Sequence, residues 1–155
     1  MIKPAFQSLL QNFPRKTSRE ELFTDIGWTD LIRNKAYLDT CAIRMSYGLL
    51  RAGVHLPGAR MRANAGPLKG QYIEPGQAKL SNILQQLWGA PEVYQGETAA
   101  VAGMGSRAGV VSFFRISSGD GGHIDLIWLE PGRLFQDCAR SCYFSAVTIW
   151  FWPLR

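Results

Sequence analysis

The segment 39–53 constrains the fold more than any other part of the chain, because it predicts a helix that is buried around most of its circumference. Asp39 or Thr40 can cap its N-terminus, and Gly53 can end it in the left-handed conformation, so we expect a helix from about Cys41 to Ala52. A wide arc of this helix is apolar, and the narrow opposite strip consists of Arg44, Gly48 and Arg51. Such a helix belongs in a core, with other elements packed around it.

The pattern of apolar residues changes along the chain from helical spacing to β-branched and aromatic runs. Helical spacing recurs at 5–13, at 18–26 behind a Ser-Arg-Glu-Glu capping box, and at 80–88. β-Branched and aromatic runs then predict strands at 109–116, 123–129 and 147–152, the first two forming an antiparallel hairpin. We expect 53–76 to be a long basic loop and 101–108 to be a glycine-rich connection. N-terminal helices packed on an antiparallel sheet make an α+β fold, and 155 residues suit a single domain, 1–155.

Cys41 stands at the first turn of the predicted helix, where a thiol can act as a nucleophile. Unpaired backbone N–H groups and the positive end of the helix dipole both favour the thiolate. Most cysteines outside disulfides are instead small buried apolar side chains, so a catalytic role requires a base and a group that orients it.

The chain has only two histidines as candidate bases. His55 lies past the end of the helix in a loop, whereas His123 opens a strand directly after two glycines. For the residue that orients His123 we prefer Asp137, beyond the next turn, with Asp125 as the alternative. Asp125 lies on the same strand face, but residues i and i+2 stand about 6.5–7 Å apart, which is too far for most direct hydrogen bonds.

The basic composition of the chain favours an anionic partner, and its apolar segments are too short for a membrane-spanning helix. The net charge is +5 and the pI near 9.4, which suits nucleic acid, an anionic membrane surface or bacterial cell wall. Nothing resembles a secretory signal or a membrane span, so we expect a chain made in the cytoplasm without a signal peptide. Cys138 and Cys142 lack partners at zinc-ligand spacing, so we expect no metal and no cofactor; in an oxidising compartment the two could form a disulfide.

Three stretches together resemble one known family. They are Thr40–Tyr47 (TCAIRMSY), Gly122–Leu126 (GHIDL) and the closing aromatic strand Ile149–Leu154 (IWFWPL). In this order they are similar to the amidase effectors of bacterial type VI secretion, most nearly the fourth group. Residues 53–107 carry no matching motif.

This resemblance implies a papain-like cysteine amidase that hydrolyses peptidoglycan stem peptides, at the bond between γ-D-glutamate and meso-diaminopimelate. By motif, Cys41 maps to the nucleophile, His123 to the general base and Asp137 to the third member, with Asp125 as the alternative. The implied protein is an antibacterial toxin that type VI secretion delivers to the periplasm of a rival, where Cys138 and Cys142 can pair. The implied partners are peptidoglycan, the secretion apparatus and a cognate immunity protein, without nucleic acid or stable membrane insertion.

The residues leave several alternatives open. Arg44, or the arginines of the 60–69 loop, are candidates for holding a substrate carboxylate, from charge alone. The same thiol and imidazole could cut the D-alanine–diaminopimelate cross-link, or transfer the acyl group to an amine instead of water. From another class, a non-catalytic basic module would bind nucleic acid or cell-wall polymer, with an affinity that falls steeply with salt.

Overall fold

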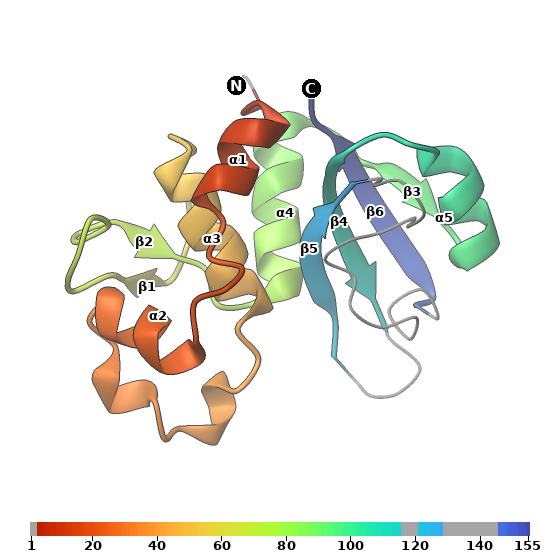
Figure 1. Ribbon diagram of the computed structural model, residues 1–155. Helices are drawn as coiled ribbons and strands as arrows, with labels where there is room; N and C mark the ends of the chain where they lie inside the picture. The colour runs from red at the N-terminus through yellow and green to blue at the C-terminus, as the bar shows by residue number, and fades with distance from the viewer. Residues whose placement is uncertain (1–2, 116–120, 129–145) are drawn as a thin grey trace.

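Figure 1 shows the computed structural model of the chain, which describes residues 3–115, 121–128 and 146–155. The helices are α1 (Phe6–Asn12), α2 (Arg19–Asp25), α3 (Cys41–Arg51), α4 (Gln77–Trp88) and α5 (Glu97–Met104), with two short 3-10 turns, η1 (Thr29–Leu31) and η2 (Lys35–Tyr37). The strands are β1 (Met61–Arg62), β2 (Tyr72–Ile73), β3 (Glu92–Tyr94), β4 (Gly109–Phe114), β5 (His123–Ile127) and β6 (Thr148–Pro153). Helices thus precede most of the sheet, as the α+β prediction requires.

Helix α3 is the centre of the helical layer and contacts α1, α4, β2 and β5. Its predicted apolar arc is buried, and the strip opposite that arc is covered as well. Gly48 on this strip is buried against the end of α1, where an added Cβ would come within 3.2 Å of the Phe13 Cα. The glycine therefore lets α1 approach closely, and of the strip only Arg51 is exposed.

The predicted helix boundaries are confirmed where the sequence carries a cap or a terminator. The Ser18 side chain accepts a hydrogen bond from the Glu21 backbone N–H at 3.1 Å, which satisfies one open donor at the start of α2. Gly27, Gly53 and Gly89 follow α2, α3 and α4 with positive φ angles, a conformation that glycine adopts without steric cost.

The main sheet has the strand order β3-β6-β4-β5, and all its neighbouring strands are antiparallel. Strand β5 lies at one end of this order, on the side of α3. The two faces of the sheet bury different cores: Val110 faces the helical layer α1–α4, while Val111 packs with residues of α5. In Figure 1, α1, α3 and α4 lie on one side of the sheet and α5 lies beside β3 at its other end.

One prediction about connecting segments was confirmed and one was wrong. The basic segment 53–76 is mostly irregular, as expected, and contains a small antiparallel pair, β1 with β2. The segment 101–108 is not simply a connection, because its first part belongs to α5. Gly103 lies against the Tyr94 ring, with no space for a Cβ, so this glycine marks close packing of α5 on β3.

The described residues include no helix long and apolar enough to cross a membrane.

Candidate active site

Cys41 is the first residue of α3 and is partly exposed in a hollow between this helix and β5. The chain enters the helix through Asp39, whose Oδ1 accepts a hydrogen bond from the Cys41 backbone N–H at 3.0 Å. Arg44 then braces the first turn by donating from Nε to the Thr40 hydroxyl at 2.9 Å. The nucleophile candidate thus stands on a rigid, buried helix whose entry is fixed by side-chain hydrogen bonds.

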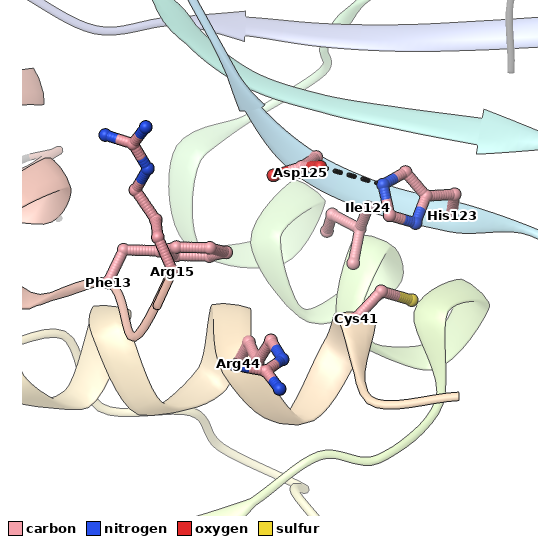
Figure 2. Close-up of a pocket in the computed structure, with 7 residues that line it drawn as sticks. All are labelled: Phe13, Arg15, Cys41, Arg44, His123, Ile124 and Asp125. Carbon is pink, nitrogen blue, oxygen red and sulfur yellow. Dashed lines mark hydrogen bonds and ion pairs between the residues drawn. The ribbon is translucent and has the colours of Figure 1, made fainter. Parts of the chain in front are cut away.

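His123 and Asp125 are two residues apart on β5 and make direct contact. The His123 Nε2 and an Asp125 carboxylate oxygen lie 2.8 Å apart, and the other carboxylate oxygen accepts the Leu126 backbone N–H at 2.8 Å. Figure 2 shows the Cys41 sulfur directed toward the His123 ring, on the side away from Asp125. The imidazole therefore lies between the thiol and the carboxylate, as a nucleophile, base and orienting group must be arranged.

The expectation that Asp125 would be too far from His123 for a direct hydrogen bond is wrong. The spacing of two residues along a strand describes the distance between Cα atoms, whereas the 2.8 Å contact joins the ends of two side chains that lean toward each other. The preferred residue, Asp137, and the cysteines Cys138 and Cys142 lie outside the described residues.

The remaining walls of this catalytic hollow come from the end of α1 and from the residues that follow it. Phe13, Arg15 and Arg44 line it together with Cys41, Ile124 and the His123–Asp125 pair. The Arg15 guanidinium lies 4.8 Å from the centre of the Trp128 ring, a cation–π distance that holds it at the mouth of the hollow. Neither Phe13 nor Arg15 carries a local signal in the sequence, because both reach the hollow only through the packing of α1 on α3.

Arg44 lines the hollow as a predicted substrate-binding residue would, but much of its guanidinium bonds to the protein. Its Nη1 donates to the backbone oxygens of Pro14 and Thr17 at 2.6 and 2.7 Å, which ties segment 14–17 to the catalytic helix. Burial lowers the pKa of Arg44. Its role toward a substrate carboxylate stays a prediction, restricted to its remaining donors.

The electrostatics of the hollow differ from the sequence expectation for the thiol. Burial raises the pKa of the Cys41 thiol well above its usual range, and the adjacent Asp39 carboxylate raises it further. These effects outweigh the hydrogen bonds from the Ile124 and Ala42 backbone, which lower it. Burial and Asp39 thus disfavour the thiolate, which the helix N-terminus alone favours, so the thiol depends on a base at the moment of attack.

Burial also raises the pKa of the Asp125 carboxyl, an effect that the His123 imidazole partly offsets. His55, the other histidine, is exposed beyond the opposite end of α3. An eleven-residue helix is about 16 Å long, so His55 is out of reach of the thiol. No cluster of three potential metal ligands was found in the described part of the chain.

Comparisons with known proteins agree with this arrangement. A family model described as Tae4, type VI secretion system (T6SS) amidase effector protein 4, matches residues 37–152. Among solved structures, the type VI effector Tae4 from Enterobacter cloacae matches with a TM-score of 0.76 at 22% identity, over 99% of this chain and 98% of that chain. Its complex with Tai4 gives 0.74 at 21% identity, over 99% and 100% of the two chains.

A Tae4/Tai4 effector–immunity structure from Salmonella typhimurium matches with a TM-score of 0.76 at 16% identity, over 99% of this chain and 100% of that chain. A search of curated proteins finds no match. The structural likenesses establish the fold, which is the papain-like α+β fold of these effectors, with the cysteine helix packed against the histidine strand. Because the family match spans most of the chain and includes Cys41 and His123, the chain belongs to the family of type VI secretion amidase effectors, group 4.

Proposed function

We propose that this amidase effector is a cysteine hydrolase that cuts peptidoglycan stem peptides between γ-D-glutamate and meso-diaminopimelate. The observation that carries the proposal is the line of Cys41, His123 and Asp125 in one hollow. Family membership supports amide hydrolysis. The assignment of this particular bond rests on the resemblance of the cysteine and histidine motifs to the fourth group.

The proposed reaction begins with proton transfer from the Cys41 thiol to His123. Because the Asp125 carboxylate only accepts hydrogen bonds, it selects the tautomer with the proton on Nε2, which leaves Nδ1 as the base. The sulfur attacks the scissile carbonyl carbon as the proton leaves. The mechanism therefore needs no thiolate before the substrate binds, and it is compatible with the raised pKa of the Cys41 thiol. Asp125 then stabilises the imidazolium.

His123 returns the proton to the nitrogen of the scissile bond, the carbon–nitrogen bond breaks, and the amine leaves. Water then attacks the thioester while His123 accepts its proton. The collapse of this second intermediate releases a carboxylic acid and the Cys41 thiolate, to which His123 returns the proton. The same imidazole thus acts twice as a base and twice as an acid. The aspartate is never required to change its protonation.

The Cys41 backbone N–H is the proposed donor to the oxyanion, together with a neighbouring N–H group of the first turn of α3. In the resting structure this donor is bonded to Asp39. Asp39 therefore has to release the N–H when the carbonyl oxygen arrives. Its exposed position leaves it free space in which to turn away.

The proposal extends to the biology that the family implies. The chain acts as a toxin in the periplasm of a target cell, reached by type VI secretion, and there the oxidising environment lets Cys138 and Cys142 pair. The relatives from Enterobacter cloacae and Salmonella typhimurium were solved in complex with Tai4 immunity proteins. We propose a cognate immunity protein for this chain as well.

The test is mass spectrometry of purified Gram-negative muropeptides after incubation with this protein or with Cys41→Ala. The proposal predicts a fragment split between D-glutamate and diaminopimelate, absent with the variant, whose fold is checked by circular dichroism. A fragment split at the D-alanine cross-link would retain the chemistry and correct the bond. Unchanged muropeptides with folded protein would overturn the hydrolase, and salt-sensitive retention on cell wall would then identify a binding module.

A further inference from the structure

A second hollow adjoins the nucleophile on the other side of Asp39. Asp39 and Arg60 both line it, with Met61 and Pro75 as apolar lining. Its volume is about 430 Å³, against about 170 Å³ for the catalytic hollow. The catalytic hollow has little room beyond the scissile bond, whereas this Asp39–Arg60 hollow can hold the end of an amino-acid side chain.

Asp39 provides the negative charge of this hollow. Its side chain is exposed, and no Lys, Arg or His of the described residues lies within ion-pair distance of it. It is also next to the reaction, because its Oδ1 holds the Cys41 N–H. A group that binds Asp39 therefore fixes the substrate close to the nucleophile, and charge complementarity selects an ammonium.

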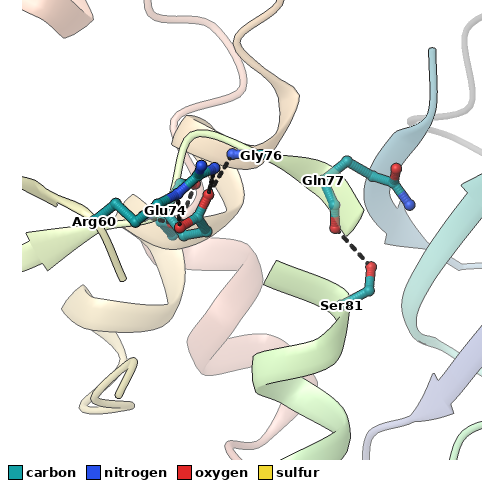
Figure 3. Close-up of polar contacts among 6 residues, drawn as sticks. Arg60, Glu74, Gly76, Gln77 and Ser81 are labelled. Atoms are coloured by element: carbon teal, nitrogen blue, oxygen red, sulfur yellow. Dashed lines mark hydrogen bonds and ion pairs between the residues drawn. The ribbon is translucent and has the colours of Figure 1, made fainter. Parts of the chain in front are cut away.

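Arg60, which also lines this hollow, provides oriented donors. It bonds to both oxygens of the Glu74 carboxylate, Nε to one at 3.0 Å and Nη2 to the other at 2.7 Å. Glu74 is fully buried and also accepts the Gly76 backbone N–H at 2.7 Å, contacts that Figure 3 shows, while 57% of the Arg60 side chain is exposed. The guanidinium is thus held rigidly, and donors that Glu74 does not use reach the hollow.

The wall that carries this arginine is tied to the catalytic helix. The Ser46 hydroxyl on α3 donates to the Glu74 backbone oxygen at 3.0 Å and accepts the Glu74 N–H at 3.1 Å. Since Glu74 neutralises the charge of Arg60, the arginine supplies directed N–H groups more than net charge. The hollow therefore carries a negative charge at Asp39 and offers N–H donors at Arg60.

We propose that the Asp39–Arg60 hollow binds the free amino-acid head group at the far end of the diaminopimelate side chain, with its ammonium on Asp39 and its carboxylate on Arg60. This inference rests on the proposed function. Met61 and Pro75 lie where the short methylene chain passes. Asp39 and Arg60 are then specificity residues, and the enzyme prefers stems whose far amine is not acylated in a cross-link.

The experiment measures kcat/KM for three tetrapeptides, L-Ala–γ-D-Glu–X–D-Ala, in which X is meso-diaminopimelate, L-lysine or norleucine. Lysine lacks the far carboxylate, and norleucine lacks the amine as well. The wild-type protein should prefer diaminopimelate to lysine, and lysine to norleucine, by about tenfold each, the effect of one charge-assisted hydrogen bond. Ratios between substrates cancel general effects of a substitution on folding or on the thiol.

Each substitution should remove one ratio and keep the other. Asp39→Asn should abolish the preference for lysine over norleucine but keep that for diaminopimelate over lysine, whereas Arg60→Gln should do the reverse. Because Arg60→Gln leaves Glu74 without its cation, the double variant Arg60→Gln/Glu74→Gln repeats the measurement with a neutral pair. Asp30→Asn and Arg51→Gln, at exposed positions that line neither hollow, are charge-matched controls that should change neither ratio.

Equal kcat/KM values for the three peptides with the wild-type protein would overturn the subsite and leave the hydrolase intact. Variants that slow all three peptides by the same factor would also overturn it, and would make Asp39 and Arg60 structural. If the wild-type protein cleaves none of the peptides and no muropeptide, the proposed function and the subsite fall together.

Discussion

Asp125 and Glu74 are the two buried acidic side chains among the described residues, and their partners differ. Asp125 contacts His123, whose charge depends on a proton that can leave, and its second oxygen takes one backbone N–H. Glu74 receives a two-pronged contact from Arg60, which keeps its proton, and a backbone N–H besides. The Asp125–His123 pair can exchange a proton during a reaction, whereas the Glu74–Arg60 pair is a permanent structural ion pair.

The two pairs also differ in which pKa is shifted and in the cause of the shift. Burial raises the pKa of Asp125, so its charge is kept at a cost to the fold. Contact with Glu74 raises the pKa of Arg60, so the guanidinium keeps its proton throughout the physiological range. The two buried carboxylates therefore have different roles. Asp125 on β5 serves the proposed catalysis, and Glu74 fixes the position of Arg60 in the Asp39–Arg60 hollow. Substitutions should separate these roles.

The largest expected effect is on turnover. Asp125→Asn should lower kcat by about 10²- to 10⁴-fold, because a neutral amide stabilises the imidazolium less than a carboxylate does and can select the wrong tautomer through its N–H group. The measurement is kcat on the diaminopimelate peptide, with Asp137→Asn as the parallel variant. If Asp125→Asn stays within threefold of wild type while Asp137→Asn loses activity, Asp137 is the orienting residue and the contact of Asp125 with His123 is not needed for catalysis.

The second effect is on stability. Arg60→Gln should lower the free energy of unfolding by about 3 kcal/mol, the lower end for a broken buried ion pair, since Arg60 reaches solvent. The measurement is urea unfolding, with Glu74→Gln/Arg60→Gln as the control that should recover part of the loss. An Arg60→Gln protein as stable as wild type would show that Glu74 needs no cation, and that its ion pair with Arg60 does not stabilise the fold.

Part of the fold and of the candidate site could be predicted from the sequence, namely the features that a short segment determines by itself. The cap at Ser18, the glycines after three helices and the β-branched and aromatic runs of β4 and β5 each act within a few residues, so those elements are as expected. Cys41 and His123 were identifiable for the same reason, since each opens an element with its own signal.

The remainder depends on contacts between distant segments. Arg15 reaches the catalytic hollow, and Arg60 reaches Glu74, only after the helices have packed, and no local pattern marks either. The pKa of the thiol was predicted in the wrong direction because the helix terminus is visible in sequence whereas burial is not. The Asp125 contact was missed because strand spacing says little about where two side chains end.

A third, smaller effect should run opposite to the second. Because the pKa of Asp125 is raised in the folded state, its contribution to stability is present at acid pH and is lost as pH rises from about 3.9, the unfolded value, through the folded value. At pH 7 Asp125→Asn should therefore raise the melting temperature above that of the wild-type protein. At pH 3.5 the gain should vanish. A variant less stable than wild type at pH 7 would show that the ionised pair with His123 stabilises the fold.

The smallest effect concerns Asp39, a carboxylate that is neither buried nor paired with a cation among the described residues, and so falls outside both classes. Burial is the main cause of the raised pKa of the Cys41 thiol, and Asp39 adds to it, so Asp39→Asn should lower that pKa. Alkylation by iodoacetamide at pH 8 should then accelerate by about two- to fivefold, the effect of one exposed charge near 4 Å. Asp30→Asn is the control of equal charge. An unchanged rate would mean that water screens Asp39 from the sulfur, and the 3.0 Å contact with the Cys41 N–H would then be its only action on the nucleophile.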